Sequence, residues 1–82
     1  KVSVNNPGLD VTVHGAGDDP TAKLVFVANP TSEPIAAVVE VGGRLGAVRE
    51  LWDGRDVATD GTAIAETLAP YSIHIYRCTV TA

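Results

Sequence analysis

Five carboxylates in the second half of the chain are the side chains that most readily suggest a reaction. A pair of carboxylic acids can hydrolyse a glycosidic bond when both flank a substrate cleft and one lies in an apolar pocket. A domain of 82 residues has little room for such a cleft, because ligand pockets enclose about 300 Å³ or more. Asp53 and Asp60 each precede a glycine, and the formation of a tight turn explains both. We therefore expect no catalysis by this chain, whose candidate carboxylates are Glu50, Asp53, Asp56, Asp60 and Glu66.

The other reactive side chains are too scattered to predict a metal or nucleophilic site. His14 and His74 lie on separate predicted strands, where both read as half-exposed strand residues. Asp10 and the acidic pair 18–19 could offer oxygens to calcium, but the spacing of a calcium-binding loop is absent. Cys78 and two distant histidines do not make a tetrahedral zinc set. The sequence thus predicts neither a metal nor a cofactor.

Trp52 and Tyr76 are the candidates for binding rather than catalysis. A planar indole stacks well on a sugar ring, and an exposed tryptophan beside a turn would suit that role. The alternative is that Trp52 packs on the core where the turn at Asp53-Gly54 closes. We favour this alternative, because a small core with few aromatic residues needs large side chains.

Alternation in the last predicted strand assigns its two tyrosines to opposite faces. Tyr71 shares its parity with Ile73 and Ile75, so we expect Tyr71 in the core. Tyr76 has the opposite parity, together with Cys78. We therefore expect Tyr76 to face solvent or a partner domain.

Charge and composition exclude several classes of partner. The net charge is −4, and the six basic residues are scattered through the sequence. Nucleic acid requires a basic stripe that neutralises phosphates, so no nucleic acid partner is expected. An anionic membrane surface is disfavoured for the same reason, and no apolar run approaches the roughly 20 residues needed to cross a bilayer.

The single cysteine and the first residues suggest a piece of a larger protein. Cys78 alone cannot form an internal disulfide, although small secreted domains usually need such cross-links. The chain begins at Lys1 without an initiator methionine or a signal peptide. We expect residues 1–82 to be a single domain, excised from a longer polypeptide in which a neighbouring domain adds stability.

Strand signals dominate the chain and helix signals are weak. Apolar and polar residues alternate over 9–14, and the run 15–20 predicts a turn or loop. The Asp-Gly pair at 53–54 predicts a tight hairpin with positive φ at both residues. The runs predict about seven strands and a small antiparallel β-sandwich with Greek-key-like connections; the clearest strands are 23–28, 35–41, 45–52, 62–68 and 71–79.

The predicted strand over 23–28 is apolar on both of its faces. Leu24 to Ala28 is apolar without interruption, so both faces of this strand are expected to be covered. A neighbouring domain packed on one sheet face would account for this pattern, and a core between two sheets is the alternative explanation.

Three segments together resemble the C-terminal all-β domain that follows the (β/α)8 barrel in many glycoside hydrolases. Residues 24–35 are similar to its pattern of an apolar strand, Asn, a short polar turn, Pro and a second apolar strand. Residues 50–55, Glu-Leu-Trp-Asp-Gly-Arg, look like the strand and hairpin that follow. Residues 68–77 resemble the ending, a Leu-x-Pro-Tyr corner leading into an alternating strand, although Ser72 stands where that family often has glycine. Residues 1–22 match no element of it.

The resemblance implies a non-catalytic accessory domain that packs on and stabilises the catalytic domain of a secreted or extracellular glycoside hydrolase, with a cytoplasmic location as the alternative. The family's catalytic carboxylates lie on the barrel, so none is expected in this chain. A second hypothesis is a carbohydrate-binding module with Trp52 and Tyr76 as stacking residues for an oligosaccharide. A third is an Ig-like protein-interaction domain, which a large apolar patch without aromatic planes would favour.

Overall fold

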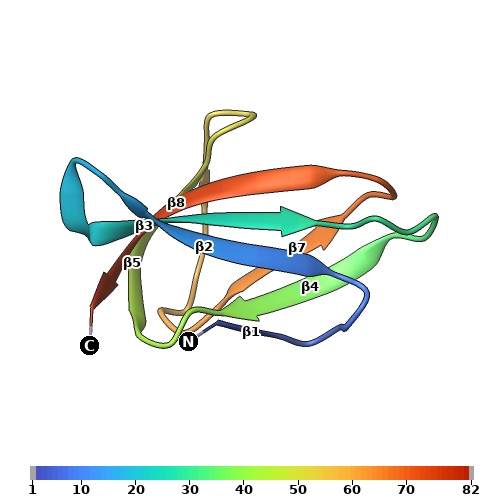
Figure 1. Ribbon diagram of the computed structural model, residues 1–82, viewed down its shortest axis with the longest axis horizontal. Helices are drawn as coiled ribbons and strands as arrows, with labels where there is room; N and C mark the ends of the chain where they lie inside the picture. The colour runs from blue at the N-terminus through green and yellow to red at the C-terminus, as the bar shows by residue number, and fades with distance from the viewer. Residues whose placement is uncertain (1, 82) are drawn as a thin grey trace.

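A computed structural model describes residues 2–81 and arranges them as two antiparallel sheets packed face to face (Figure 1). None of the described residues is helical, so none forms a helix that could cross a membrane. The predicted all-β antiparallel sandwich is confirmed, with eight strands in place of about seven. The strands are β1 (Ser3–Val4), β2 (Asp10–Ala16), β3 (Asp19–Ala28), β4 (Ile35–Glu40), β5 (Arg44–Glu50), β6 (Arg55–Val57), β7 (Ile64–Leu68) and β8 (Ile73–Thr81).

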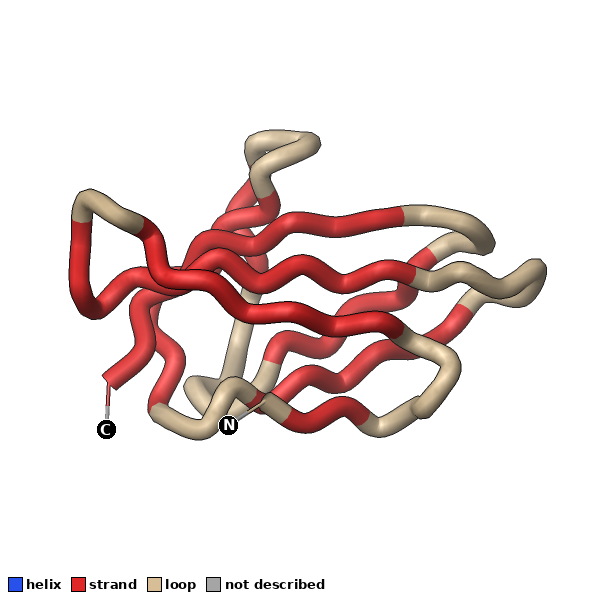
Figure 2. Tube along the Cα trace, viewed as in Figure 1, coloured by secondary structure: helices blue, strands red, loops and turns tan. Residues whose placement is uncertain are grey.

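The last strand of the chain lies in the middle of the larger sheet. The five-stranded sheet has the order β2-β3-β8-β5-β6, and the three-stranded sheet has the order β1-β4-β7. The chain therefore crosses between sheets several times, and strands distant in sequence become neighbours, as in Greek-key sandwiches. Figure 2 shows that the connecting loops gather at the ends of the strands, where two segments far apart in sequence can meet.

Aliphatic side chains from both sheets fill the core. Strand β4 alternates buried and exposed residues without a break, as a strand with one solvated face should. Burial of one valine, leucine or isoleucine side chain stabilises the fold by about 1.5–3 kcal/mol. The apolar side chains with the lowest exposure are Val25, Val27, Val39, Ile64, Leu68, Tyr76 and Cys78.

Two predicted turns differ from the observed ones. The segment 15–20 is mostly strand, because β2 and β3 extend to Ala16 and Asp19 around a bulge. The Asp53-Gly54 turn is longer than a two-residue hairpin loop, since the β5–β6 connection spans 51–54. Only Gly54 in it has positive φ, at 64°, so Asp53 does not adopt the expected left-handed conformation.

Strand β3 is covered on one face only within the described chain. Val25 and Val27 are buried beneath the smaller sheet, whereas the alternate residues Leu24, Phe26 and Ala28 are half-buried. These three side chains project from the outer face of the five-stranded sheet, where neither sheet covers them. The predicted cover for this second face is therefore not supplied by residues 2–81.

Candidate functional site

The outer face of the five-stranded sheet carries an apolar stripe across its two central strands. Residues directly opposite one another in antiparallel strands project to the same face. Ala28 pairs with Ile73, and Phe26 pairs with Ile75. Leu24, Phe26, Ala28, Ile73 and Ile75 are hereafter called the apolar outer face.

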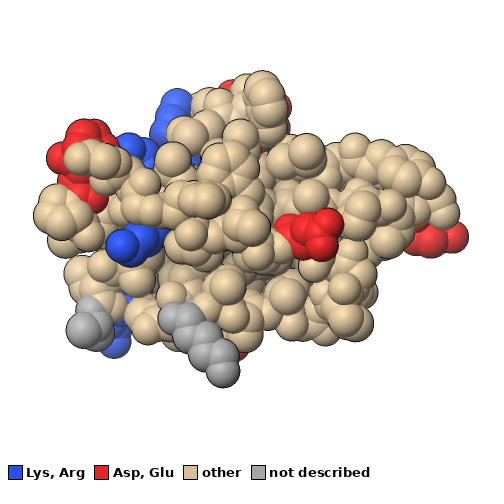
Figure 3. All heavy atoms as spheres, in the orientation of Figure 1, with Lys and Arg blue, Asp and Glu red and all other residues tan. Residues whose placement is uncertain are grey.

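Polar residues border the apolar outer face. Asp10, Thr12 and His14 lie beside it on β2, opposite Ala28, Phe26 and Leu24. On β8, Arg77 lies opposite Leu24 and pairs with Asp18 at 3.0 Å, so a charged residue ends the stripe there. The ring of His14 meets that of Phe26 edge-on, with centroids 5.5 Å apart. Figure 3, in the same orientation as Figure 1, shows few charged side chains on the face turned to the reader, where β2, β3 and β8 lie in front. A mainly uncharged sheet face with a polar border is typical of a surface that another protein surface covers.

Both aromatic residues beyond the end of this face have positions that differ from our predictions. Trp52 is 67% exposed and does not pack on the core. Tyr71 is 71% exposed, so its predicted core position is also wrong. Within β8, alternation separates Ile73 from Tyr76 and Cys78 as predicted, but the predicted sides are reversed. Tyr71 precedes β8, which begins at Ile73, so the alternation of the strand does not extend to it. Tyr71 and Ile73 are exposed, and Tyr76 is buried.

Trp52 and Tyr71 both line a shallow hollow of about 400 Å³. Asp53, Ser72, Ile73 and His74 complete its lining. The hollow lies where the β5–β6 turn passes the first residues of β8, so segments far apart in sequence form it. Of these residues we predicted only Trp52 as a binding residue, although the Leu-x-Pro-Tyr corner marked the position of Tyr71.

A buried asparagine holds the corner that presents Tyr71. The Asn29 side chain is 1% exposed and donates through Nδ2 to the carbonyls of Glu33, Leu68 and Ala69. Its Oδ1 accepts from the backbone N–H and the hydroxyl of Thr31, at 3.0 and 2.7 Å. The loop after β3 and the corner before β8 therefore share one set of hydrogen bonds.

Tyr71 itself has a strained backbone. Its φ is 56°, and no other non-glycine residue with positive φ is found among residues 2–81. A left-handed conformation costs a side-chain-bearing residue about 1–2 kcal/mol. The corner thus keeps a large aromatic residue both strained and exposed, which the stability of the fold does not require.

Tyr76 belongs to a polar network between the sheets and cannot act as a stacking platform, because it is 1% exposed. Its hydroxyl donates to Oε1 of Glu66 at 2.5 Å, and Nδ1 of His74 lies 2.7 Å from the same hydroxyl. Arg55 binds Glu66 with two hydrogen bonds of 2.6 and 2.9 Å. Since β6 and β7 belong to different sheets, this network joins the two sheets along one side.

The electrostatics of the network favour an ionised Glu66. Hydrogen bonds from Arg55 lower the pKa of Glu66 to about 2, against the opposing effect of burial. Burial and the adjacent Glu66 raise the pKa of Tyr76 well above its usual value. The tyrosine therefore stays protonated and donates to a carboxylate, which makes the network a structural ion pair.

The remaining candidate carboxylates also have structural partners. Glu50 is fully buried and accepts from the backbone N–H groups of Asp53 and Ile75, at 2.8 and 3.0 Å. Asp56 pairs with Arg49 on the surface, and Asp60 caps the turn at Thr62. No group of three or more His, Cys, Asp or Glu side chains within residues 2–81 could hold a metal ion.

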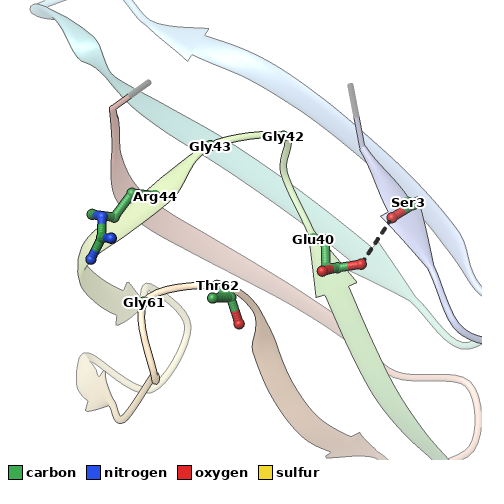
Figure 4. Close-up of a pocket in the computed structure, with 7 residues that line it drawn as sticks. All are labelled: Ser3, Glu40, Gly42, Gly43, Arg44, Gly61 and Thr62. Atoms are coloured by element: carbon green, nitrogen blue, oxygen red, sulfur yellow. Dashed lines mark hydrogen bonds between the residues drawn. The ribbon is translucent and has the colours of Figure 1, made fainter.

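A second, larger hollow of about 740 Å³ lies beside Glu40, the last residue of β4, and the turn that follows it. Figure 4 shows Glu40 turned toward Ser3, whose hydroxyl is 3.5 Å away, whereas the guanidinium of Arg44 points away from Glu40. Its polar side chains therefore do not converge on a common point, and the hollow carries no candidate site. Its lining residues are Ser3, Glu40, Gly42, Gly43, Arg44, Gly61 and Thr62.

Comparisons with protein families, with curated proteins and with solved structures found no match to this chain. The candidate sites are therefore the apolar outer face and the hollow between Trp52 and Tyr71, both argued from their own geometry.

Proposed function

We propose that this chain is a non-catalytic accessory domain that packs the outer face of its five-stranded sheet on the catalytic domain of a secreted glycoside hydrolase and stabilises it. The observation that carries the proposal is the apolar outer face. An antiparallel sheet exposed to water on one side normally presents polar residues there. Here β3 and β8 present leucine, phenylalanine, alanine and isoleucine over most of their paired length, and Arg77, opposite Leu24, ends the stripe.

The arrangement of the carboxylates supports an accessory role. Glu50 and Glu66 accept hydrogen bonds from this chain's own backbone and side chains, and Asp53 pairs with Arg55. Such fully used carboxylates are suited to holding the fold, whereas a glycosidase needs its acids aimed into a cleft.

The position of the resembling segments supports the choice of partner. Residues 24–35 and 68–77 are distant in sequence, but they contain β3 and β8, which pair from Ala22 to Ala28. Their outward side chains together form the apolar outer face. The two segments that resemble the accessory domains of glycoside hydrolases are thus the segments that build the proposed contact surface.

Charging the centre of the apolar outer face is expected to uncouple the two domains. Phe26→Lys places an ammonium group in the middle of the stripe, and Thr12→Lys places one on its directly paired neighbour on β2. In a polypeptide that joins this chain to the proposed catalytic domain, Phe26→Lys should separate the domain's calorimetric transition from that of the catalytic domain. It should also shorten the half-life of hydrolase activity at elevated temperature, because a buried unpaired charge opposes docking.

The matched variant distinguishes docking from a general effect of charge. Thr12→Lys should leave a single joint transition, and both variants should keep the strand circular dichroism of the isolated 82-residue chain. The proposal is wrong if Phe26→Lys, like Thr12→Lys, leaves the two domains unfolding in a single calorimetric transition. It is equally wrong if the natural polypeptide contains no hydrolase domain.

A further inference from the structure

The hollow between Trp52 and Tyr71 contains backbone groups that the sheet leaves without a strand partner. In an antiparallel sheet, successive residues of a strand direct their backbone N–H and C=O groups to the two neighbouring strands in turn. Asn29 N–H donates to the Ser72 carbonyl at 2.9 Å, so Ser72 and every second residue after it direct these groups toward β3. Ile73 therefore directs its N–H and C=O to the opposite side. β5 lies on that side of β8, but β5 ends at Glu50 and therefore does not pair with Ile73.

The β5–β6 turn leaves a gap beside Ile73. The last backbone bond from this side runs from Leu51 N–H to the Ile75 carbonyl at 2.8 Å, and the Ile75 N–H donates to Glu50. In Figure 1 the β5–β6 turn, drawn in yellow, rises away from the sheet and does not continue alongside the start of β8. One donor and one acceptor of the Ile73 backbone thus face the hollow between the two exposed aromatic rings.

His74 adds a polar side chain to the lining of the hollow. Its Nδ1 lies 2.7 Å from the Tyr76 hydroxyl and 3.4 Å from Oε1 of Glu66, so the network between the sheets holds the imidazole in place. The Asp53 carboxylate supplies further acceptor oxygens, and its charge is offset by Arg55 at 3.3 Å.

These groups suit a neutral polyhydroxylated ring. Trp52 and Tyr71 offer flat apolar faces for the C–H surface of a sugar, and the polar groups between them accept and donate hydrogen bonds to hydroxyls. An added peptide strand would need free backbone groups on alternate residues, but those of Ile75 are already used. An anionic ligand would meet the carboxylate of Asp53. We propose that this hollow is a binding site for a neutral saccharide, with Trp52 and Tyr71 as its stacking residues.

The strain at Tyr71 gives this assignment independent support. Glycine would adopt a φ of 56° without a steric penalty, and an exposed tyrosine adds nothing to the core. A ligand that stacks on the Tyr71 ring accounts for a residue whose strained backbone lowers the stability of the fold. This inference does not rest on the docking proposal, because the hollow is complete within the 82-residue chain.

The test is an NMR titration of the isolated chain with neutral fragments of xylan, arabinan, glucan and galactan. We expect at least one fragment to give saturable shifts at millimolar concentration, centred on the Trp52 indole N–H and the amides of Tyr71 and Ile73. Trp52→Ala and Tyr71→Gly should each weaken that binding by about tenfold or more, since each removes a stacking face.

Two matched variants separate loss of the site from loss of the fold. Tyr71→Gly relieves the left-handed strain, so the midpoint of thermal unfolding should stay at or above that of the wild type while binding is lost. Tyr71→Phe keeps the ring and should keep the affinity. Leu51→Ala removes another exposed apolar side chain, 43% exposed, that does not line the hollow, and should bind as the wild type does.

Two results would overturn the saccharide site. One is a folded, well-dispersed spectrum that none of the four glycan series shifts at high millimolar concentration. The other is saturable binding that Trp52→Ala and Tyr71→Gly leave unchanged. Neither result bears on the docking proposal, whose test uses Phe26 and Thr12.

Discussion

Replacing Asn29 with alanine is expected to lower the free energy of unfolding by about 3 kcal/mol, because several buried polar groups then lose their partner together. The Asn29 amide satisfies three carbonyls and its oxygen accepts two hydrogen bonds from Thr31. An alanine methyl group replaces none of these. Chemical denaturation monitored by circular dichroism would measure the loss as a lower midpoint at unchanged slope.

Asn5 provides a matched control for Asn29. It also bridges backbone groups, since Nδ2 donates to the Ala36 carbonyl and Oδ1 accepts from Val38 N–H. Asn5 is exposed, however, so water can replace both bonds, and Asn5→Ala should cost less than about 1 kcal/mol. Equal losses for the two variants would show that Asn29 does not hold the loop and the corner together.

Strand positions could be predicted from the sequence because alternation and turn residues are local properties. The parity of β8 is an example, since Ile73 and Tyr76 do lie on opposite faces of the strand, one exposed and one buried. Which side is buried could not be predicted, because either set offers one tyrosine and other apolar residues to the core. The choice depends on Glu66 and Arg55, which reach Tyr76 from β7 and β6. Contacts of that kind have no local signature.

The position of Trp52 shows a second limit of the sequence. We predicted that an aromatic-poor chain would need the indole in its core. The observed core is filled by valine, isoleucine and leucine, and Tyr76 alone of the aromatic residues is fully buried among residues 2–81. The four-residue turn at 51–54 then carries Trp52 outward. We predicted a tighter turn from the Asp-Gly pair, but the pair does not determine where β5 ends and β6 begins, which depends on pairing with the neighbouring strands.

The candidate site was predictable only in part for the same reason. Trp52 and the corner at Tyr71 were both conspicuous in sequence, but their meeting depends on β8 lying beside β5. The unpartnered backbone of Ile73 depends on where β5 ends. Asn29 was recognised only as the asparagine in the pattern of residues 24–35, and an asparagine directly after an apolar strand was the available signal for its structural role.

Acid is expected to weaken the fold through Glu66, and this effect should disappear in Glu66→Gln. The pKa of Glu66 is lowered from 4.5 to about 2 in the folded chain, so the unfolded chain binds a proton first as the pH falls. The stabilisation is complete above about pH 4.5 and is lost progressively between about pH 4.5 and pH 2. We expect a loss of about 2 kcal/mol over this range, less than the full linkage value because the Arg55 side chain is 39% exposed.

The difference in unfolding free energy between the wild type and Glu66→Gln separates the contribution of Glu66 from those of other acidic residues. Asp19 and Asp60 also have lowered pKa values through hydrogen bonds to threonines, so the wild-type curve contains several groups. Urea denaturation at intervals from pH 7 to pH 2, repeated for Glu66→Gln, gives the difference directly. The variant should be about 2 kcal/mol less stable than the wild type at pH 7, with the gap closing toward pH 2.

Glu40→Gln is the control for this measurement, because Glu40 is exposed and its single hydrogen bond to Ser3 is 3.5 Å long. It should follow the wild-type curve at every pH. A constant gap between wild type and Glu66→Gln would mean that the Glu66 carboxylate is not held ionised by Arg55. The hydrogen bonds from Arg55 and Tyr76 to Glu66 would then join the two sheets without a pH-dependent contribution to stability.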